Sequence, residues 1–169
     1  QVGAGAATSF ATPQVVLPDD VVDACVGPSR TCAVVGAGAN REVQCWGRSV
    51  GGPPANSSVP VSIPGTATAL TVACGLEFTC VTLADQTVTC WGVNDDGQLG
   101  DGTFVGHATP APVLDLGGVV DLFAGQYHAC ALREDGLVSC WGRNDRGQLG
   151  TNVPIYYGDF VEVALGDGS

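Results

Sequence analysis

The chain has 169 residues, of which 45% are hydrophobic and 14% charged, which is enough for a core and too apolar for a disordered chain. All six cations are arginines, against 17 acidic residues, and the net charge of −11 argues against nucleic-acid binding. No apolar run approaches the roughly 20 residues of a membrane-spanning helix, so we expect no membrane span. The 25 glycines and 10 prolines favour short strands between turns, and we predict an all-β protein.

Three similar segments follow one another along the chain, and each contains a Cys-Trp-Gly triplet. Their tryptophans Trp46, Trp91 and Trp141 are spaced by 45 residues (46 to 91) and 50 residues (91 to 141). Such spacing is typical of repeated units of short strands. We therefore expect repeat units at 13–58, 59–108 and 109–158, after a tail at 1–12 and before a last segment at 159–169.

Each unit is expected to contain four short strands, and the last two form a hairpin. The first two strands are expected at 13–17 and 21–26, at 59–63 and 68–74, and at 111–116 and 119–124. In the third unit the hairpin strands are His128–Arg133 and Leu137–Gly142, with a three-residue loop that ends at Gly136. Gln86 takes the place of this glycine in the second unit, and we expect it to be strained by up to about 1 kcal/mol.

The hairpin register predicts three disulfides. It sets Cys130 opposite Cys140, and directly opposite residues have Cβ atoms about 4.5–5.5 Å apart, near enough for a disulfide after a small adjustment. The corresponding pairs in the other two units are Cys80 with Cys90 and Cys32 with Cys45. Because each cysteine and its neighbouring tryptophan point to opposite faces, both faces of every sheet carry bulky residues, as in the stacked blades of a propeller.

Two cysteines, Cys25 and Cys74, remain after these assignments. They lie seven and six residues before Cys32 and Cys80, and Ala124 occupies the corresponding place in the third unit. We expect a disulfide that joins the first and second blades, which requires Cα atoms within about 7 Å of each other. A bond between two chains is the alternative.

The third unit reads AGQYHACALREDGLVSCWGRNDRGQLG over 124–150, and the second matches it closely. This pattern resembles the repeat of the regulator of chromosome condensation family, in particular the cysteine-bearing repeats of its secreted members. The resemblance covers roughly residues 12 to 165 and implies blades of a β-propeller. Members of that family act as scaffolds, among them a nuclear exchange factor and a secreted inhibitor of β-lactamases, and they share no catalytic residues.

Three blades are too few for a closed ring, which needs about four or more. The segment 159–165 reads as the first strand of a fourth copy, so we expect an orphan terminal strand with Phe160, Val161, Val163 and Leu165 available for assembly. Two arrangements remain open. The chain is a segment of a longer array whose other blades close the ring, or identical chains join head to tail as a ring or filament.

Several catalytic and metal-binding patterns fail on their context. Ser49 stands in a G-x-S-x-G pattern, but no helix follows it and it lies in a degenerate repeat loop. The acidic residues of 94–97 and Asp101 do not have the spacing of a calcium loop. His107 is an isolated loop residue, and His128 occupies a position at which the other repeats have Arg and Phe, so we expect no metal site.

We therefore expect a non-enzymatic protein with no cofactor. The paired cysteines predict a secreted or cell-surface location, and Asn56 begins a sequon that could carry a glycan. The favoured function is a structural scaffold that assembles head to tail with copies of itself, as a filament or a ring, through its exposed end blades and terminal strand; its partners are such copies or further blades of the same array. The alternative is a secreted propeller segment that binds another extracellular protein through the loops 93–108 and 143–158.

Overall fold

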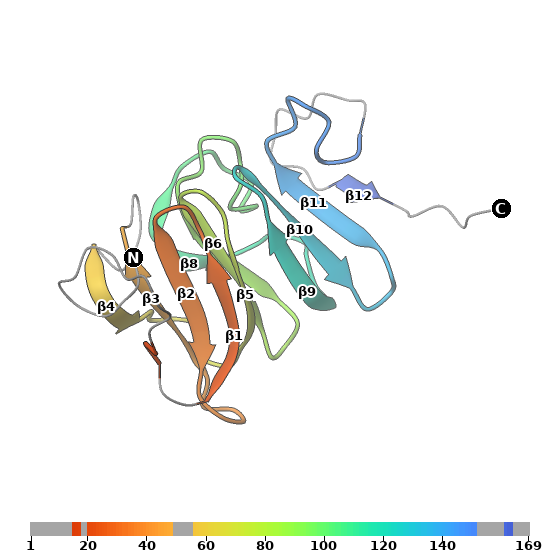
Figure 1. The fold of residues 1–169 in the computed structure, drawn as a ribbon. Coiled ribbons are helices and arrows are strands. Elements are labelled where there is room, and N and C mark those ends of the chain that lie inside the picture. Colours follow the sequence, from red (N-terminus) through yellow and green to blue (C-terminus); the bar gives the residue numbers. More distant parts are fainter. Residues whose placement is uncertain (1–14, 18–19, 49–55, 152–160, 164–169) are drawn as a thin grey trace.

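The computed structural model describes residues 15–17, 20–48, 56–151 and 161–163, and all regular structure in them is β (Figure 1). The strands are β1 (Val21–Val26), β2 (Arg30–Val35), β3 (Glu42–Gly47), β4 (Ser57–Ser62), β5 (Ala69–Cys74), β6 (Phe78–Leu83), β7 (Val88–Gly92), β8 (His107–Pro112), β9 (Val119–Ala124), β10 (His128–Arg133), β11 (Val138–Gly142) and β12 (Val161–Val163). In these described parts of the chain there is no helix that could cross a membrane. The predicted all-β class is confirmed.

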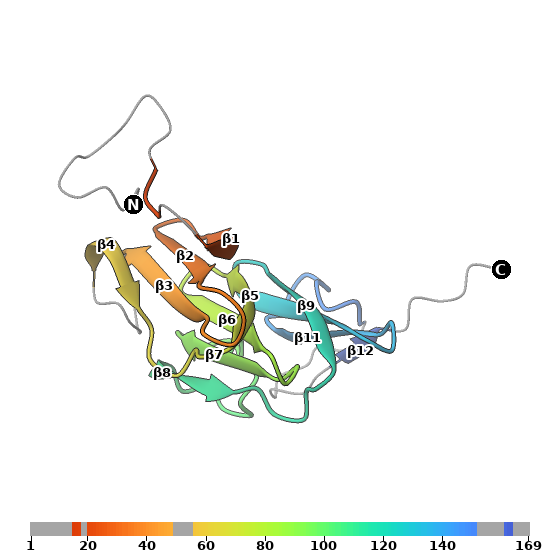
Figure 2. The same cartoon turned by 90° about the horizontal axis from the view of Figure 1, so that it is seen from below.

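The strands form three antiparallel sheets of four strands each. The first sheet contains β1 to β4, the second β5 to β8 and the third β9 to β12, and in each the strands lie side by side in chain order. The sheets are stacked through their inner strands: β5 contacts β1 and β2, and β9 contacts β5 and β6. Figure 2 shows β1, β5 and β9 next to one another, with the outer strands fanning away. This is the blade arrangement that the repeats predict.

The grouping of strands differs from the expected one by one position. The expected first strand of the second unit, 59–63, falls in β4 and pairs with β3 of the first sheet, where Cys45 lies opposite Val61. The first strand expected for the third unit, 111–116, overlaps with β8 only at 111–112; β8 itself lies earlier and pairs with β7 of the second sheet. The sheets span 21–62, 69–112 and 119–163. The alternation of apolar residues shows that a strand exists, but it does not show which of two neighbouring sheets the strand joins.

The two ends of the chain therefore also differ from the prediction. The terminal strand is not an orphan, because β12 pairs with β11 and Val161 lies opposite Cys140. Phe160 and Leu165, which were expected in the same strand, lie outside the described residues. The strand expected at 13–17 is absent over 15–17, and its first two residues also lie outside the described part.

The core consists of two apolar layers, one between each pair of neighbouring sheets. Trp91 packs in the layer between the first and second sheets, together with Cys32 and Cys45. Trp141 packs in the layer between the second and third sheets, together with Cys80 and Cys90. The disulfide-bearing faces of the first and second sheets are thus covered by the tryptophan-bearing faces of the second and third sheets.

The eight cysteines form four disulfides. Three of them, Cys32–Cys45, Cys80–Cys90 and Cys130–Cys140, join directly opposite residues of a hairpin, with Cα atoms 4.1 Å apart. The fourth, Cys25–Cys74, joins the first sheet to the second over a Cα separation of 5.5 Å. It is an intramolecular bond between blades, one of the two pairings that the sequence left open.

The register explains why the fourth bond joins two sheets. Cys25 lies opposite Cys32, whereas the residue opposite Cys80 is Ala73 and Cys74 lies opposite Thr79. The position in β5 that corresponds to Cys25 is therefore Ala73, and Cys74 is one residue further along the strand. Because side chains alternate along a strand, Cys74 points to the other face of its sheet, toward the first sheet.

Candidate functional site

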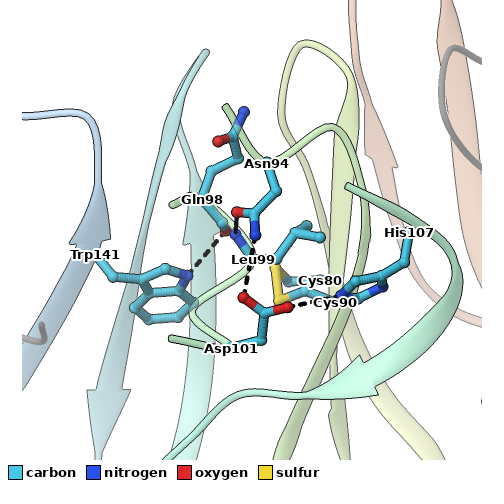
Figure 3. The surroundings of a disulfide bond; sticks show 8 residues. All are labelled: Cys80, Cys90, Asn94, Gln98, Leu99, Asp101, His107 and Trp141. Carbon is cyan, nitrogen blue, oxygen red and sulfur yellow. Dashed lines mark hydrogen bonds and ion pairs between the residues drawn. A yellow bond between two sulfur atoms is a disulfide. The ribbon is translucent and has the colours of Figure 1, made fainter. Parts of the chain in front are cut away.

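The loop that follows β7 is held by a buried asparagine (Figure 3). The side-chain amide of Asn94 donates to Asp101 at 3.1 Å and to the backbone carbonyl of Thr103 at 3.0 Å. Its carbonyl oxygen accepts a hydrogen bond from the backbone N–H of Leu99 at 2.9 Å. His107 completes the arrangement with its Nε2 atom 2.9 Å from Asp101. These contacts fix the shape of the loop.

The same contacts determine the charge state of Asp101. Burial alone would raise the pKa of this carboxyl group, but hydrogen bonds from Thr103, His107 and Asn94 together lower it below the usual range. Since an amide N–H donates into the carboxylate, the cluster that resembles a calcium loop in the sequence is a structural clamp.

The other candidate residues of the sequence do not form a site. Ser49 lies outside the described residues. The ring of His128 lies directly over Gly125, where a Cβ atom would come within 2.1 Å of it, and burial lowers the pKa of His128. In the described part of the chain, the cluster of possible metal ligands is Cys25, Cys32 and Cys74, all of which are in disulfides.

The joint between the second and third sheets consists of a few specific contacts. The indole N–H of Trp141 donates to the backbone carbonyl of Gln98 at 3.0 Å (Figure 3). The backbone N–H of Leu76 donates to the carbonyl of Gln126 at 3.0 Å. Gly142 approaches the second sheet so closely that a Cβ atom there would lie 3.3 Å from the Cα atom of Gln98. The sequence Trp-Gly therefore fits onto the loop of the preceding sheet.

The third sheet carries a second copy of the loop that receives this Trp-Gly pair. Leu149 N–H donates to the Asn144 side chain at 3.0 Å, as Leu99 does to Asn94. The backbone N–H of Arg146 donates to the Gln148 side chain at 2.9 Å, as that of Asp96 does to Gln98 at 2.8 Å. The turns that follow also match: Gly147 and Gly150 donate to carbonyls three residues back, as Gly97 and Gly100 do. The two loops have the same conformation.

Among the described residues, the hydrogen bonds that a neighbouring sheet makes to the first copy have no counterpart at the second, although Leu149 of the second copy is buried. Phe123 on the disulfide-bearing face of the third sheet is 55% exposed, and Cys130 is only partly buried, whereas Cys80 and Cys90 are completely buried. The backbone N–H of Gln126 and the backbone carbonyl of Gln148 have no hydrogen-bond partner within the part of the chain that the structure describes. Their counterparts Leu76 and Gln98 are paired across the joint.

A cleft of about 270 Å³ lies at this open end. It is lined by Gln126, Tyr127, His128, Arg143, Asp145, Arg146 and Gln148. The guanidinium group of Arg143 stands 5.3 Å from the centre of the Tyr127 ring, within the range of a cation–π contact. We call the cleft, together with the face that bears Phe123 and Cys130, the open face. The sequence predicts uncovered end sheets, because three blades are too few for a closed ring, but it does not identify the residues of the cleft, for which the repeated Asn-Asp-x-Gly-Gln-Leu-Gly loop was the signal.

The chain resembles known proteins in both sequence and structure. Residues 70–98 and 119–148 match a family model described as regulator of chromosome condensation (RCC1) repeat, and a second model with this description matches residues 86–132. No curated protein sequence matches the chain.

Among solved structures, human WBSCR16 is similar, with a TM-score of 0.72 and 18% sequence identity over 87% of this chain and 40% of that one. Prp20, the RCC1 protein of the yeast Saccharomyces cerevisiae, gives a TM-score of 0.66 and 21% identity over 83% of this chain, in a complex with Kap60 and in a study of its binding to Gsp1p and histones. The chain spans 34% and 35% of the length of the Prp20 chains. At these identities the likeness shows the fold.

Proposed function

Because this chain carries repeats of the regulator of chromosome condensation family, we propose that it is a non-enzymatic extracellular scaffold whose open face binds a further sheet of the same repeat type. The observation that carries the proposal is the second copy of the receiving loop, which has the same hydrogen bonds as the loop that holds Trp141. A sheet that brings another Trp-Gly pair would pair the Gln148 carbonyl and the Gln126 N–H, and would cover Phe123.

On the open face, groups such as the Gln148 carbonyl and the Gln126 N–H have no partner among the described residues. The corresponding groups of the second sheet have partners in its joint with the third sheet. Burial of apolar surface stabilises the docked state by roughly 25 cal/mol per Å². Each backbone group that gains a partner in a water-poor joint contributes about 1 kcal/mol. A repeat scaffold or protein-binding role also agrees with the RCC1 relatives, one of which was crystallised bound to Kap60.

The extracellular location is proposed from the cysteines. All eight are in disulfides, and such bonds persist in oxidising compartments. Asn56 of the sequon is exposed at the start of β4 and is accessible to a glycan there. Expression through a secretory pathway, followed by peptide mapping, tests both features, and free thiols or an unoccupied Asn56 would count against them.

The occupant of the open face is a further blade or a second copy of this chain. Head-to-tail assembly of copies would use the tryptophan-bearing face of the first sheet, but Trp46 is only 6% exposed. A second copy could dock in the way that Trp141 does only after Trp46 is uncovered. This favours a further blade over a filament of identical chains.

A second candidate function is binding of another protein through the loop of 93–106. Phe104 and Val105 are 44% and 70% exposed at its tip, while the Asn94 clamp holds their backbone in place. A rigid loop that presents apolar side chains loses little conformational entropy on binding. Phe104→Ser with Val105→Ser should then abolish partner binding without changing the stability of the fold.

A hairpin peptide tests the proposed docking directly. The probe has the sequence of residues 126–143, closed by the Cys130–Cys140 disulfide, and the isotope-labelled chain is titrated with it by NMR. We expect shifts at Gln126 and at 148–150, and weaker binding of a peptide with Trp141→Phe, which lacks the indole N–H. If neither peptide shifts these amides at millimolar concentration, the proposed function is wrong.

A further inference from the structure

We propose that the open face selects a repeat sheet with an acidic residue directly after its Trp-Gly pair, and therefore a partner other than a second copy of this chain. This inference rests on the proposed function and specifies the partner of the same site. The acidic residue would stand directly after Trp-Gly on the incoming sheet. In the joint between the second and third sheets, Arg143 has this position.

In that joint the glycine of Trp-Gly lies against an acidic loop, and the residue after it pairs with Asp145 of its own sheet and is also acted on by the charge of that loop. Gly142 lies against the backbone of Gln98, and the backbone N–H of Asp96 is bonded to the Gln98 side chain at 2.8 Å. Arg143, the next residue, is therefore held near Asp96. The hydrogen bond and charge of Asp145 raise the pKa of Arg143 most, and the carboxylate of Asp96 raises it further. The joint thus places opposite charges across the two sheets.

On the open face the charge at this position is reversed. The two receiving loops have matching hydrogen bonds at four positions, so Arg146 holds the place in the third sheet that Asp96 holds in the second. Arg146 is exposed and lines the cleft together with Arg143. Arg143 is ion-paired with Asp145, which lines the same cleft, so Arg146 supplies the positive charge that this pair does not balance, in a chain with a net charge of −11. An incoming carboxylate would be attracted there, and an incoming guanidinium would be repelled.

The sheets of this chain do not meet the requirement. The residues directly after their Trp-Gly pairs are Arg48, Val93 and Arg143, and none is acidic. Docking of a second copy through its first sheet would bring Arg48 toward Arg146. The charge pattern therefore disfavours identical chains in a row and favours a distinct blade.

The test uses two forms of the hairpin peptide described above, one with the native Arg143 and one with Arg143→Glu. Each is titrated onto the labelled chain at about 20 mM and at 500 mM salt. We expect the glutamate peptide to bind about fivefold more tightly at low salt, the size expected for an exposed pair that changes from repulsion to attraction. The preference should shrink at high salt, since screening weakens exposed charge pairs.

Two full-length variants with the same net charge test whether the preference for the glutamate peptide depends on Arg146. Arg146→Glu should reverse the preference, so that the arginine peptide binds more tightly. Arg48→Glu, on the first sheet, should leave the preference as it is in the native chain. Retained amide dispersion shows that each variant is folded.

The outcomes separate the two proposals. Equal binding of both peptides at low salt, or a preference that survives Arg146→Glu, overturns the acidic-partner inference and leaves the docking proposal standing. Absence of binding by either peptide overturns the docking proposal and the inference with it.

Discussion

Arg30 offers the sharpest prediction about stability. It begins β2 at the position that Phe78 and His128 occupy in the other sheets, and it is only 2% exposed. Its Nε, Nη1 and Nη2 atoms lie buried without a hydrogen-bond partner within the described residues. Burial lowers the pKa of Arg30 from its ordinary value to about 10, although the carboxylate of Glu77 acts in the opposite direction. The charged form is therefore disfavoured by folding.

The size of the effect follows from the shift. A change of about two and a half pKa units corresponds to roughly 3 kcal/mol against the folded state at neutral pH. The penalty is fully present below pH 10, because the group is charged in both states there, and it decreases as pH rises above about 10 toward the ordinary pKa of an arginine. Phenylalanine fills the corresponding place in the second sheet and is completely buried there.

We therefore expect Arg30→Phe to raise the free energy of unfolding by about 2–3 kcal/mol at pH 7, a rise in Tm of roughly 5 °C or more. Denaturant unfolding followed by tryptophan fluorescence measures it. The matched control is Phe78→Arg, which introduces the same unpaired charge in the second sheet and should destabilise strongly. A less stable Arg30→Phe protein would refute the reasoning, because it would mean that the guanidinium has a stabilising partner.

Three further predictions concern the turn, the bridge between sheets and the clamp. Gln86 has a φ of 64°, so Gln86→Gly should stabilise the protein by about 0.5–1 kcal/mol in thermal unfolding; a loss of stability would argue against strain at this turn. Replacing Cys25 and Cys74 by alanine should cost about 2–4 kcal/mol, since their bond closes a loop with a sequence separation of 49; an unchanged denaturant midpoint would contradict this. Folding lowers the pKa of Asp101, so its ionised carboxylate stabilises the folded protein above pH 3.8, and this stabilisation is lost as pH falls below that value. The Asp101→Asn protein should therefore lose less stability on acidification than the native protein. Parallel profiles of stability against pH for the two proteins would contradict the clamp.

The hairpins were predictable because their register is local. The spacing between Cys130 and Cys140 and the loop that ends at Gly136 determine the strand pairing, and the observed register pairs these two cysteines. The bridge between the first two sheets was encoded in the offset of Cys25 and Cys74 by one residue. That offset decides which face of a strand a side chain occupies.

The assignment of outer strands to sheets was not predictable in the same way. All residues of β4 and β8 are exposed or half-buried, so their sequences do not favour one neighbouring sheet over the other. Pairing with the preceding hairpin is a tertiary choice, made through contacts such as Ile63 N–H to the Val43 carbonyl at 2.8 Å. The number of blades predicts that the end sheets are uncovered, but the residues of the open face were not predictable, because a receiving loop has the same sequence with or without an occupant.

Amide hydrogen exchange on the isolated chain tests the central claim most directly, by comparing Leu76 with Gln126. These two N–H groups hold corresponding positions in successive sheets, and only that of Leu76 has a partner across a joint in the described structure. We predict slow exchange at Leu76 and exchange at Gln126 that is at least tenfold faster. Equal protection of the two amides would mean that the third sheet is already covered and would contradict an open docking face.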